Sequence, residues 1–295
     1  MELLKVDNLT KKFKNKIAVN NVNLSVQKGQ LVALLGHNGA GKSTTISMLI
    51  GLMKPTNGEI KLAGFSPNDA KYRQKLGVVF QNSVLDDDLT VEKNIDIRAH
   101  MYKNLDIHFK NKLIDDFELK NIIHQKYKTL SGGQRRRVDI VRSLLNKPEI
   151  LFLDEPSTGL DIQTRNKIWE VLNNLRKSMN LTIILTTHYL EEAEDADFVY
   201  VMDKGNIVAN DTVNDLKIKY TKDKLTLYSN NVHALKQHLD IDVAEETFES
   251  LTININDHND AINILSKIKD FITTFEYKRG SMDDIFIALT GKEIQ

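Results

Sequence analysis

The sequence predicts an α/β fold in which a parallel sheet carries an inserted helical block and is followed by a small α+β domain. Apolar runs occur at 31–35, 150–153, 182–186 and 198–202, and such runs are typical of strands buried on both faces. Segments with helical spacing separate them, and strands that alternate with helices favour a parallel sheet. The composition changes near Tyr220, beyond which no proline occurs, and this change indicates a second domain.

The N-terminal part of the chain predicts antiparallel strands beside the parallel sheet. Between residues 3 and 26 the pattern is strand-like, and at 22–26 apolar residues alternate with polar ones, as expected of a half-buried strand. The run at 31–35 follows, buried on both faces. A glycine-rich turn and a helical pattern over 43–53 come next.

A helical insertion is expected at about 82–147, with helical patterns at 91–101 and 109–117. A further helix before the strand at 182–186 places four apolar side chains on one face: Ile168, Leu172, Leu175 and Met179. After Tyr220, strand-like stretches (224–228, 248–255, 273–277) alternate with helix-like ones (232–238, 261–269, 282–289). The sequence therefore predicts two domains, at 1–220 and 221–295.

Composition and charge exclude several classes of protein. The chain has 295 residues, of which 41% are hydrophobic and 27% charged, a profile typical of soluble globular proteins. Lysine plus arginine (40) balances aspartate plus glutamate (40), so no global field attracts nucleic acid. The chain has no cysteine, which excludes disulfides, thiolate metal sites and thiol catalysis. No apolar stretch approaches the roughly 20 residues that cross a bilayer, and the first residues include no apolar run of the length expected for a secretion signal.

The glycine-rich segment after the strand at 31–35 fits the pattern of a phosphate-binding loop. Its candidate binding residues are Gly36, Asn38, Gly39, Ala40, Gly41, Lys42, Ser43 and Thr44. Glycines allow successive N–H groups to converge on phosphate oxygens, and the helix N-terminus adds partial positive charge. Lys42 would bind the β- and γ-phosphates, and the Ser43 hydroxyl would bind Mg²⁺. The alternative is an ordinary glycine-rich turn, which the position between a strand and a helix disfavours.

A second candidate site follows the strand at 150–153, which ends in Asp154 and Glu155. The carboxyl ends of parallel strands meet at one edge of a sheet, so both carboxylates are expected beside the phosphate loop. There Asp154 can hold Mg²⁺, and Glu155 can polarise the water that attacks the phosphate. Alone, two acidic residues at a strand end are more typical of a solvated edge. The neighbouring phosphate loop reverses that preference.

The segment Leu130–Gln134 reads Leu-Ser-Gly-Gly-Gln and precedes a helix. With this pentapeptide, residues 1–220 closely resemble the ATP-binding cassette (ABC) ATPases. Their core is a phosphate-loop domain with an antiparallel β subdomain and an inserted helical subdomain. In that family the pentapeptide completes the ATP site of a partner chain, so two ATPs lie within a head-to-tail dimer. The resemblance implies that Ser131, Gly132, Gly133 and Gln134 bind nucleotide.

The other motifs of the family occur in order. The resemblance implies that Gln81 contacts the Mg²⁺ site and links it to the helical block, and that Asp161 belongs to a loop at the dimer seam. It also implies that His188 contacts the γ-phosphate and that Phe13 stacks on adenine. Taken singly, His188 and Phe13 would be more typical of core or surface residues. The catalytic residues expected from the full set are Glu155, His188 and Lys42.

The last stretch, 277–291, resembles the end of ATPase subunits from bacterial ABC-2-type exporters. A terminal amphipathic helix is the plainer interpretation of the same pattern. The resemblance implies hydrolysis of ATP with Mg²⁺, coupled to a separate transmembrane permease that exports a drug, peptide or similar amphipathic compound. Alternatives are the ATPase of an importer or a soluble ABC protein that acts on ribosomes or DNA.

The expected partners are the permease and a second ATPase subunit, either an identical chain or a paralogue. The expected location is the cytoplasm, on the inner face of the cell membrane through the permease. Arg135–Arg137 is the most tempting basic patch for nucleic acid. Three basic residues at the start of a helix are more often a solvated face, so no nucleic-acid partner is expected.

Overall fold

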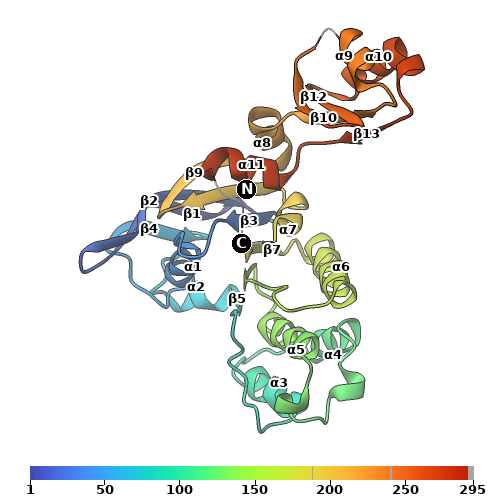
Figure 1. Cartoon of the computed structure of the whole chain (residues 1–295). Helices are drawn as coiled ribbons and strands as arrows, with labels where there is room; N and C mark the ends of the chain where they lie inside the picture. The colour runs from blue at the N-terminus through green and yellow to red at the C-terminus, as the bar shows by residue number, and fades with distance from the viewer. Residues whose placement is uncertain (188, 240, 292–295) are drawn as a thin grey trace. The chain divides into compact units, whose positions relative to one another are not determined.

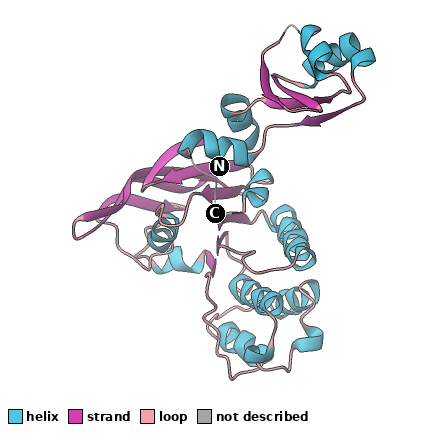
Figure 2. Ribbon diagram, in the orientation of Figure 1, coloured by secondary structure: helices cyan, strands magenta, loops and turns pink. Residues whose placement is uncertain are grey.

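The computed structural model describes residues 1–187, 189–239 and 241–291. The chain divides into two compact units, the first ending at Asp211 and the second beginning at Thr212. Figure 1 shows the elements of each unit along the chain, and Figure 2 shows their secondary structure. In the described part of the chain, each helix is either too short or too polar to cross a bilayer.

The predicted parallel sheet is confirmed in the first unit. Its strand order is β5-β6-β7-β3-β8-β9, in which all neighbours are parallel except β8 and β9. Its strands are β3 (Leu31–Leu35), β5 (Leu76–Val79), β6 (Ile150–Asp154), β7 (Thr182–Thr187), β8 (Phe198–Asp203) and β9 (Asn206–Asp211). All residues of β3 and β7 are buried, as expected for central strands covered on both faces. The carboxyl ends of β3, β6 and β7 therefore share one edge.

A second sheet of the first unit is antiparallel, as the alternating N-terminal pattern predicts. Its order is β2-β1-β4, with β1 (Glu2–Phe13), β2 (Lys16–Gln27) and β4 (Asn57–Leu62). The turn between β1 and β2 contains Lys14 at a positive φ of 47°. Side chains from both sheets and from α1 (Lys42–Leu49) form one apolar core, which includes Val6, Ile46 and Phe152. This shared core fixes the phosphate loop between the two sheets.

Four helices of the first unit lie outside the helical insertion: α1, α2 (Ala70–Gln74), α6 (Ile162–Met179) and α7 (Leu190–Glu194). Helix α1 ends at Leu49 rather than at residue 53, because Gly51 adopts a φ of 77° that breaks the helical pattern. On α6 the predicted face is buried at Ile168, Leu172 and Leu175, whereas Met179 in the last turn is half-buried.

The predicted insertion is a group of helices that Figure 1 shows together beyond β5. It contains α3 (Val91–His100), α4 (Ile107–Asp116) and α5 (Gly132–Leu144), with short 3₁₀ turns η1 (Lys120–Ile122) and η2 (Tyr127–Thr129). Side chains cap all three helices: Thr90 for α3, Asp106 for α4 and Ser131 for α5. Each cap satisfies a backbone N–H that would otherwise lack a partner.

The second unit is an α+β fold of its own, as predicted. Its antiparallel sheet has the order β11-β12-β10-β13. The strands are β10 (Asp223–Tyr228), β11 (Val243–Glu246), β12 (Ser250–Ile255) and β13 (Thr274–Lys278). The helices are α8 (Val213–Tyr220), α9 (Val232–Gln237), α10 (His258–Ile268) and α11 (Met282–Thr290), and η3 (Lys269–Phe271) is a 3₁₀ turn. Leu225, Leu227, Leu251 and Ile253 form the centre of its core.

The division between the units lies before the boundary expected at Tyr220. Helix α8 is grouped with the second unit, where it contacts α11 and buries Leu216. The sequence pattern changes only after α8, because this helix carries the same mixture of apolar and charged residues as the helices before it.

Candidate active site

The phosphate loop (Gly36–Lys42) connects the buried strand β3 to helix α1. Gly41 has a φ of 110°, and a Cβ there would lie 2.6 Å from the carbonyl oxygen of Ala18, so glycine is required. No side chain caps α1, whose N-terminal amides therefore remain available to an anion. The loop thus presents uncapped amides at the start of α1, which is where a phosphate-binding loop would need them.

Lys42 places a buried positive charge inside this loop. It is 5% exposed, and its Nζ donates to the carbonyl oxygens of Gly36, at 2.6 Å, and His37, at 3.2 Å. Burial lowers the pKa of the Lys42 ammonium, whereas the carboxylates of Glu155 and Asp154 oppose this shift. A cation held by neutral carbonyl groups beside two carboxylates is suited to bind a polyanion together with a divalent metal ion.

The phosphate loop forms one wall of a cavity of about 740 Å³, a size typical of small-molecule sites. The residues that line it are Phe13, Lys16, Ile17, Ala18, His37, Asn38, Gly39, Gly41, Lys42, Ser43, Thr44, Gln81, Glu155, Lys204 and Gly205. Phe13 is 44% exposed and presents a ring surface to this space, with the Lys11 ammonium 5.2 Å from the ring centroid. A planar base could stack on such a ring.

Sequence reasoning missed His37 within the phosphate loop and five further residues of the cavity wall: Lys16, Ile17, Ala18, Lys204 and Gly205. These five come from β2 and from the β8–β9 turn, where Gly205 donates its N–H to the Ala40 carbonyl at 2.8 Å. The dipeptide Lys204–Gly205 between two apolar strands is a hairpin signal, and both residues have positive φ. That signal predicts a turn but not its position against the phosphate loop.

The two carboxylates lie at the carboxyl end of β6, on the sheet edge that also carries the phosphate loop. Thr186, on the neighbouring strand β7, donates its hydroxyl to Asp154 Oδ1. Glu155 has a positive φ of 49°, and its N–H donates to the Thr186 carbonyl at 3.0 Å. Thr186 therefore orients both acidic residues, a role that the sequence did not indicate.

Gln81 lies beside Glu155, as expected for a residue that connects this edge to the helical insertion. Its Nε2 donates to Glu155 Oε2 at 2.9 Å, and the Thr158 hydroxyl donates to the same oxygen at 3.3 Å. These contacts orient one side of the Glu155 carboxylate. Gln81 also lines the cavity, so it can reach a ligand or metal ion there.

Asp154, Gln81 and Ser43 provide oxygen atoms of the kind that Mg²⁺ prefers, and Mg²⁺ usually has few protein ligands besides phosphate and water. Among the described residues no group of three or more His, Cys, Asp or Glu side chains could hold a metal ion. The donor set therefore fits a metal ion that arrives with a phosphate ligand better than one in a preformed protein site.

The signature loop (Leu130–Gln134) opens helix α5 but does not line this cavity. The Ser131 hydroxyl accepts from the Gln134 N–H at 3.3 Å, and the Gln134 side chain accepts from the Ser131 N–H at 2.9 Å. Ser131 and Gly132 are exposed, and a Cβ on Gly132 would meet no atom within 4 Å. None of the residues Ser131–Gln134 is among the described residues that line the cavity.

Of the two remaining predicted site residues, the structure describes Asp161 but not His188. Asp161 caps α6, since its Oδ1 accepts from the Thr164 N–H and its Oδ2 from the Thr164 hydroxyl, both at 2.8 Å. These hydrogen bonds lower the pKa of the Asp161 carboxyl. The side chain is exposed and does not line the cavity of its own chain. His188 lies outside the described residues; it directly follows β7.

Two family models match the chain. The model described as "ABC transporter" matches residues 19–158, and the model described as "ATP-binding protein DrrA1-3-like, C-terminal domain" matches residues 212–290. The second match coincides with the second unit of the structure, which begins at Thr212.

Curated relatives align over almost the whole chain. It is 34% identical to the Nod factor export ATP-binding protein I of Burkholderia lata, over 98% of this chain and 97% of that protein. It is 31% identical to the daunorubicin/doxorubicin resistance ATP-binding protein DrrA of Streptomyces peucetius, over 98% of this chain and 92% of that protein.

Among solved structures, the chain is similar to the dimeric ATP-binding cassette MJ0796 in a post-hydrolysis state bound to ADP and Pi. The TM-score is 0.66 at 29% identity, over 72% of this chain and 99% of that chain. A structure described as the ATP-binding subunit of an ABC transporter matches with a TM-score of 0.68 at 31% identity, over 74% of this chain and 93% of that chain.

Proposed function

This chain belongs to the ATP-binding subunits of ABC transporters, and from that premise we propose that it hydrolyses ATP as a dimer that drives a separate transmembrane permease. Its relatives and its DrrA-like second unit assign it to the exporter ATPases. One observation carries the proposal: a buried lysine in the phosphate loop shares a sheet edge with Asp154 and Glu155, while the signature loop faces outward.

ATP binding follows from the walls of the cavity. Phe13 would stack on the adenine, and the amides at the start of α1 would bind the phosphate oxygens. Lys42, already held by two carbonyl oxygens of the loop, would turn its ammonium to the β- and γ-phosphates. Because this charge is buried, its attraction to phosphate is screened less than that of a surface lysine.

Hydrolysis requires a group that orients and deprotonates water, and Glu155 is the best placed candidate. Gln81 and Thr158 hold its carboxylate through Oε2 at the cavity wall. Glu155 would accept a proton from the attacking water as the water approaches the γ-phosphate. His188 would contact the γ-phosphate, which the sequence alone supports.

Ser43, Gln81 and Asp154 would hold Mg²⁺, with Thr186 keeping Asp154 in position. When bound, Mg²⁺ neutralises charge that develops on the β- and γ-phosphate oxygens. The protein orients two of these donors, since Thr186 bonds Asp154 and the Gln81 amide bonds Glu155.

A dimer explains why the signature loop has no role in the site of its own chain. Ser131, Gly132, Gly133 and Gln134 would contact the ATP bound by the second subunit, and Asp161 would lie near the seam. The exposed start of α5 is an anion-binding surface without opposite walls. Another copy of the chain, or a similar ATPase, would supply those walls.

We propose that the permease partner holds the chain at the inner face of the cell membrane. Two similar proteins are named for export of Nod factors and for resistance to daunorubicin and doxorubicin. A drug, a peptide or a similar amphipathic compound is therefore the cargo class we propose.

The test is Glu155→Gln, in which an amide replaces the proton acceptor without changing its size. ATP hydrolysis should fall by ~10²–10⁴-fold, because general-base catalysis contributes an effect of that order. ATP binding should persist, and light scattering should show a dimer that forms with ATP but not with ADP. Hydrolysis at the parental rate would show that Glu155 is not the catalytic carboxylate.

A further inference from the structure

Arg136 lies on the buried side of α5, five residues after the exposed Ser131. It is 7% exposed, and its guanidinium donates to three backbone carbonyl oxygens. Nη1 donates to Phe80 at 2.6 Å, while Nη2 donates to Gln81 at 3.3 Å and to Glu155 at 2.9 Å. A single side chain of the signature helix therefore holds the backbone of two residues that surround the expected reaction centre.

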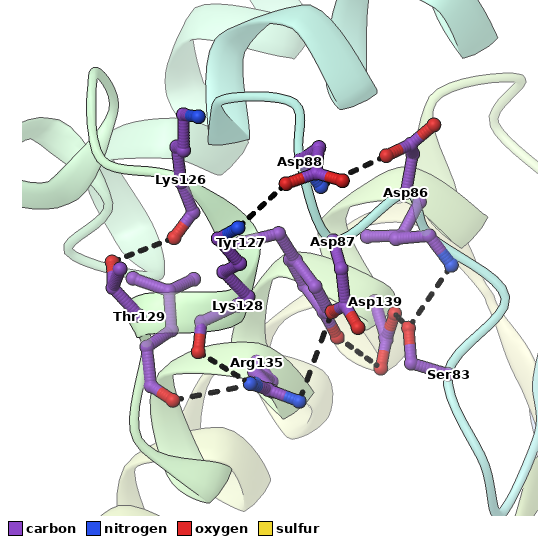
Figure 3. Close-up of polar contacts among 12 residues, drawn as sticks. Ser83, Asp86, Asp87, Asp88, Lys126, Tyr127, Lys128, Thr129, Arg135 and Asp139 are labelled. Carbon is purple, nitrogen blue, oxygen red and sulfur yellow. Dashed lines mark hydrogen bonds and ion pairs between the residues drawn. The ribbon is translucent and has the colours of Figure 1, made fainter.

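Asp139 is on the same side of α5, one turn further along, and extends this connection. It is 5% exposed and accepts from the Ser83 hydroxyl at 2.7 Å and from the Tyr127 hydroxyl at 3.2 Å. Figure 3 shows the three side chains pointing toward one another. Ser83 follows Gln81 by two residues, so α5 contacts the segment that contains Gln81 at two points.

The chemistry of these contacts favours arginine at position 136. A guanidinium is planar, carries five donors and stays charged when buried, whereas a lysine ammonium is a compact point charge. The carbonyl groups of Phe80 and Glu155 directly follow β5 and β6, and the two Nη atoms of the guanidinium reach both of them. A lysine cannot reproduce this set of bonds, so the substitution would leave partly buried carbonyl groups without the donors that Arg136 provides.

We propose that Arg136 is a positioning residue that fixes Gln81 and Glu155 relative to the signature loop. The inference rests on the proposed function of Glu155 and of the signature loop. In the dimer, the start of α5 contacts the partner's nucleotide, while Arg136 holds the residues that act on the chain's own nucleotide. The helix thereby connects the two ATP sites.

The experiment compares Arg136→Lys with Arg142→Lys in the full-length chain. Arg142 is the matched control: it lies on the same helix and donates to the Val78 carbonyl of the adjacent strand at 3.0 Å. In the described part of the chain it makes no hydrogen bond to Gln81 or Glu155. Arg136→Lys should lower kcat by on the order of 10²-fold, the effect of misplacing catalytic groups by about 1 Å. The Kd for ATP should remain at the parental value, and Arg142→Lys should keep the parental kcat.

A double-mutant cycle tests the connection to the signature loop. Ser131→Ala and Arg136→Lys should be non-additive, so the double variant should be no slower than Arg136→Lys alone. For Ser131→Ala and Arg142→Lys, the kcat of the double variant should equal the product expected from the two single effects. Additive effects in both cycles would overturn the proposed connection.

Ser83→Ala provides a second test in case Arg136→Lys does not fold. It removes one exposed hydroxyl and its bond to Asp139, and it should lower kcat without changing the Kd for ATP. The positioning role is overturned if Arg136→Lys keeps the parental kcat, or if Arg136→Lys does not fold and Ser83→Ala keeps the parental kcat. It is also overturned if Arg136→Lys and Arg142→Lys lower kcat and the melting temperature equally. If Glu155→Gln is inactive and Arg136→Lys is fully active, the proposed function stands and only this inference is refuted. Active Glu155→Gln would refute both.

Discussion

The phosphate loop and the signature loop are both glycine-rich segments that open a helix, but the chain surrounds only the first. The phosphate loop borders a cavity of about 740 Å³ and contains the buried Lys42. At the signature loop, Ser131 and Gly132 are exposed, and the space beside Gly132 is open. The two helices also differ in capping, since α1 has no side-chain cap and α5 has a complete capping box. The two loops therefore differ in burial, in neighbouring walls and in helix capping.

We propose that this contrast allows a single chain to bind nucleotide at the phosphate loop but not at the signature loop. Helix α1 directs uncapped amides and a buried cation into a walled cavity, where an anion loses water and gains strong partners. Helix α5 satisfies part of its own N-terminus with Ser131 and Gln134 and keeps two small residues at its surface. Such a surface gains little from an anion in water, because solvent screens the interaction. It becomes a site only when another wall is added.

The largest effect is expected from Lys42→Ala, which removes the charged wall of the phosphate loop. Both ATP affinity and ATP hydrolysis should fall severely, because the ammonium is the main positive charge at the β- and γ-phosphates. Equilibrium binding of a fluorescent ATP analogue and phosphate release would measure the two quantities. Near-normal hydrolysis in the permease complex would refute the assignment of this loop.

Ser131→Arg should separate the two loops, because it fills the open space at the start of α5 without touching the cavity of its own chain. The Kd for ATP of the single chain should stay at the parental value, whereas ATP-dependent dimerisation and hydrolysis should be lost. An equal loss of binding and hydrolysis would mean that the signature loop belongs to the site of its own chain.

A smaller effect is expected from the loop at 82–90, which joins Gln81 to the helical insertion. Lys128 pairs with Asp88 at 2.7 Å and Arg135 with Asp87 at 3.9 Å, so this loop lies against the first turn of α5 and the segment before it (Figure 3). Val84 in the same loop is 59% exposed, and we propose that it contacts the permease.

Val84→Asp should therefore reduce transport by on the order of tenfold, as the loss of one central apolar contact does at an interface. ATPase activity of the isolated chain should not change. Leu52→Asp is the control, because Leu52 is an exposed apolar residue after α1 and outside this loop. Equal transport defects in both variants, or cross-links that place the permease only on the second unit, would contradict this role of the loop.

The smallest effect on nucleotide binding is expected from removal of the second unit, which contributes neither loop. A chain that ends at Asp211 should bind ATP with the parental Kd, while permease association or coupled ATPase activity falls. A chain that ends at Tyr220 should have a lower melting temperature than the chain that ends at Asp211. It would keep α8 without α11, and Leu216 of α8 would then be exposed to water. Unchanged transport by the shorter chain would show that the second unit is passive.

The strands and the phosphate loop could be predicted because each depends on local sequence. The apolar run at 31–35 and the glycines after it specify a buried strand and a tight turn wherever they occur. Strand β11, at Val243–Glu246, escaped prediction because its two glutamates are exposed and its pattern does not alternate clearly. Alternation identifies a strand only when one of its faces is buried.

The positions of Thr186 and Arg136 could not be predicted, because they depend on strand order. Thr186 holds Asp154 only because β7 lies next to β6. Arg136 reaches Phe80 and Glu155 only because β5 lies next to β6 on the other side. Threonines in strands are common, and so are arginines on helices. Neither pattern predicts which residue the side chain will contact in the folded chain.

The central claim is that the signature loop of one chain faces the phosphate loop of another, and cross-linking tests it directly. The chain has no cysteine, so thiols can be introduced singly by Asn38→Cys in one Glu155→Gln chain and Gly132→Cys in a second. Both positions are exposed. With ATP and a short bifunctional thiol reagent, the mixture should form cross-linked dimers, whereas ADP, or either variant alone, should give none. Cross-linking within a single chain that carries both thiols, or no product with ATP, would contradict the account.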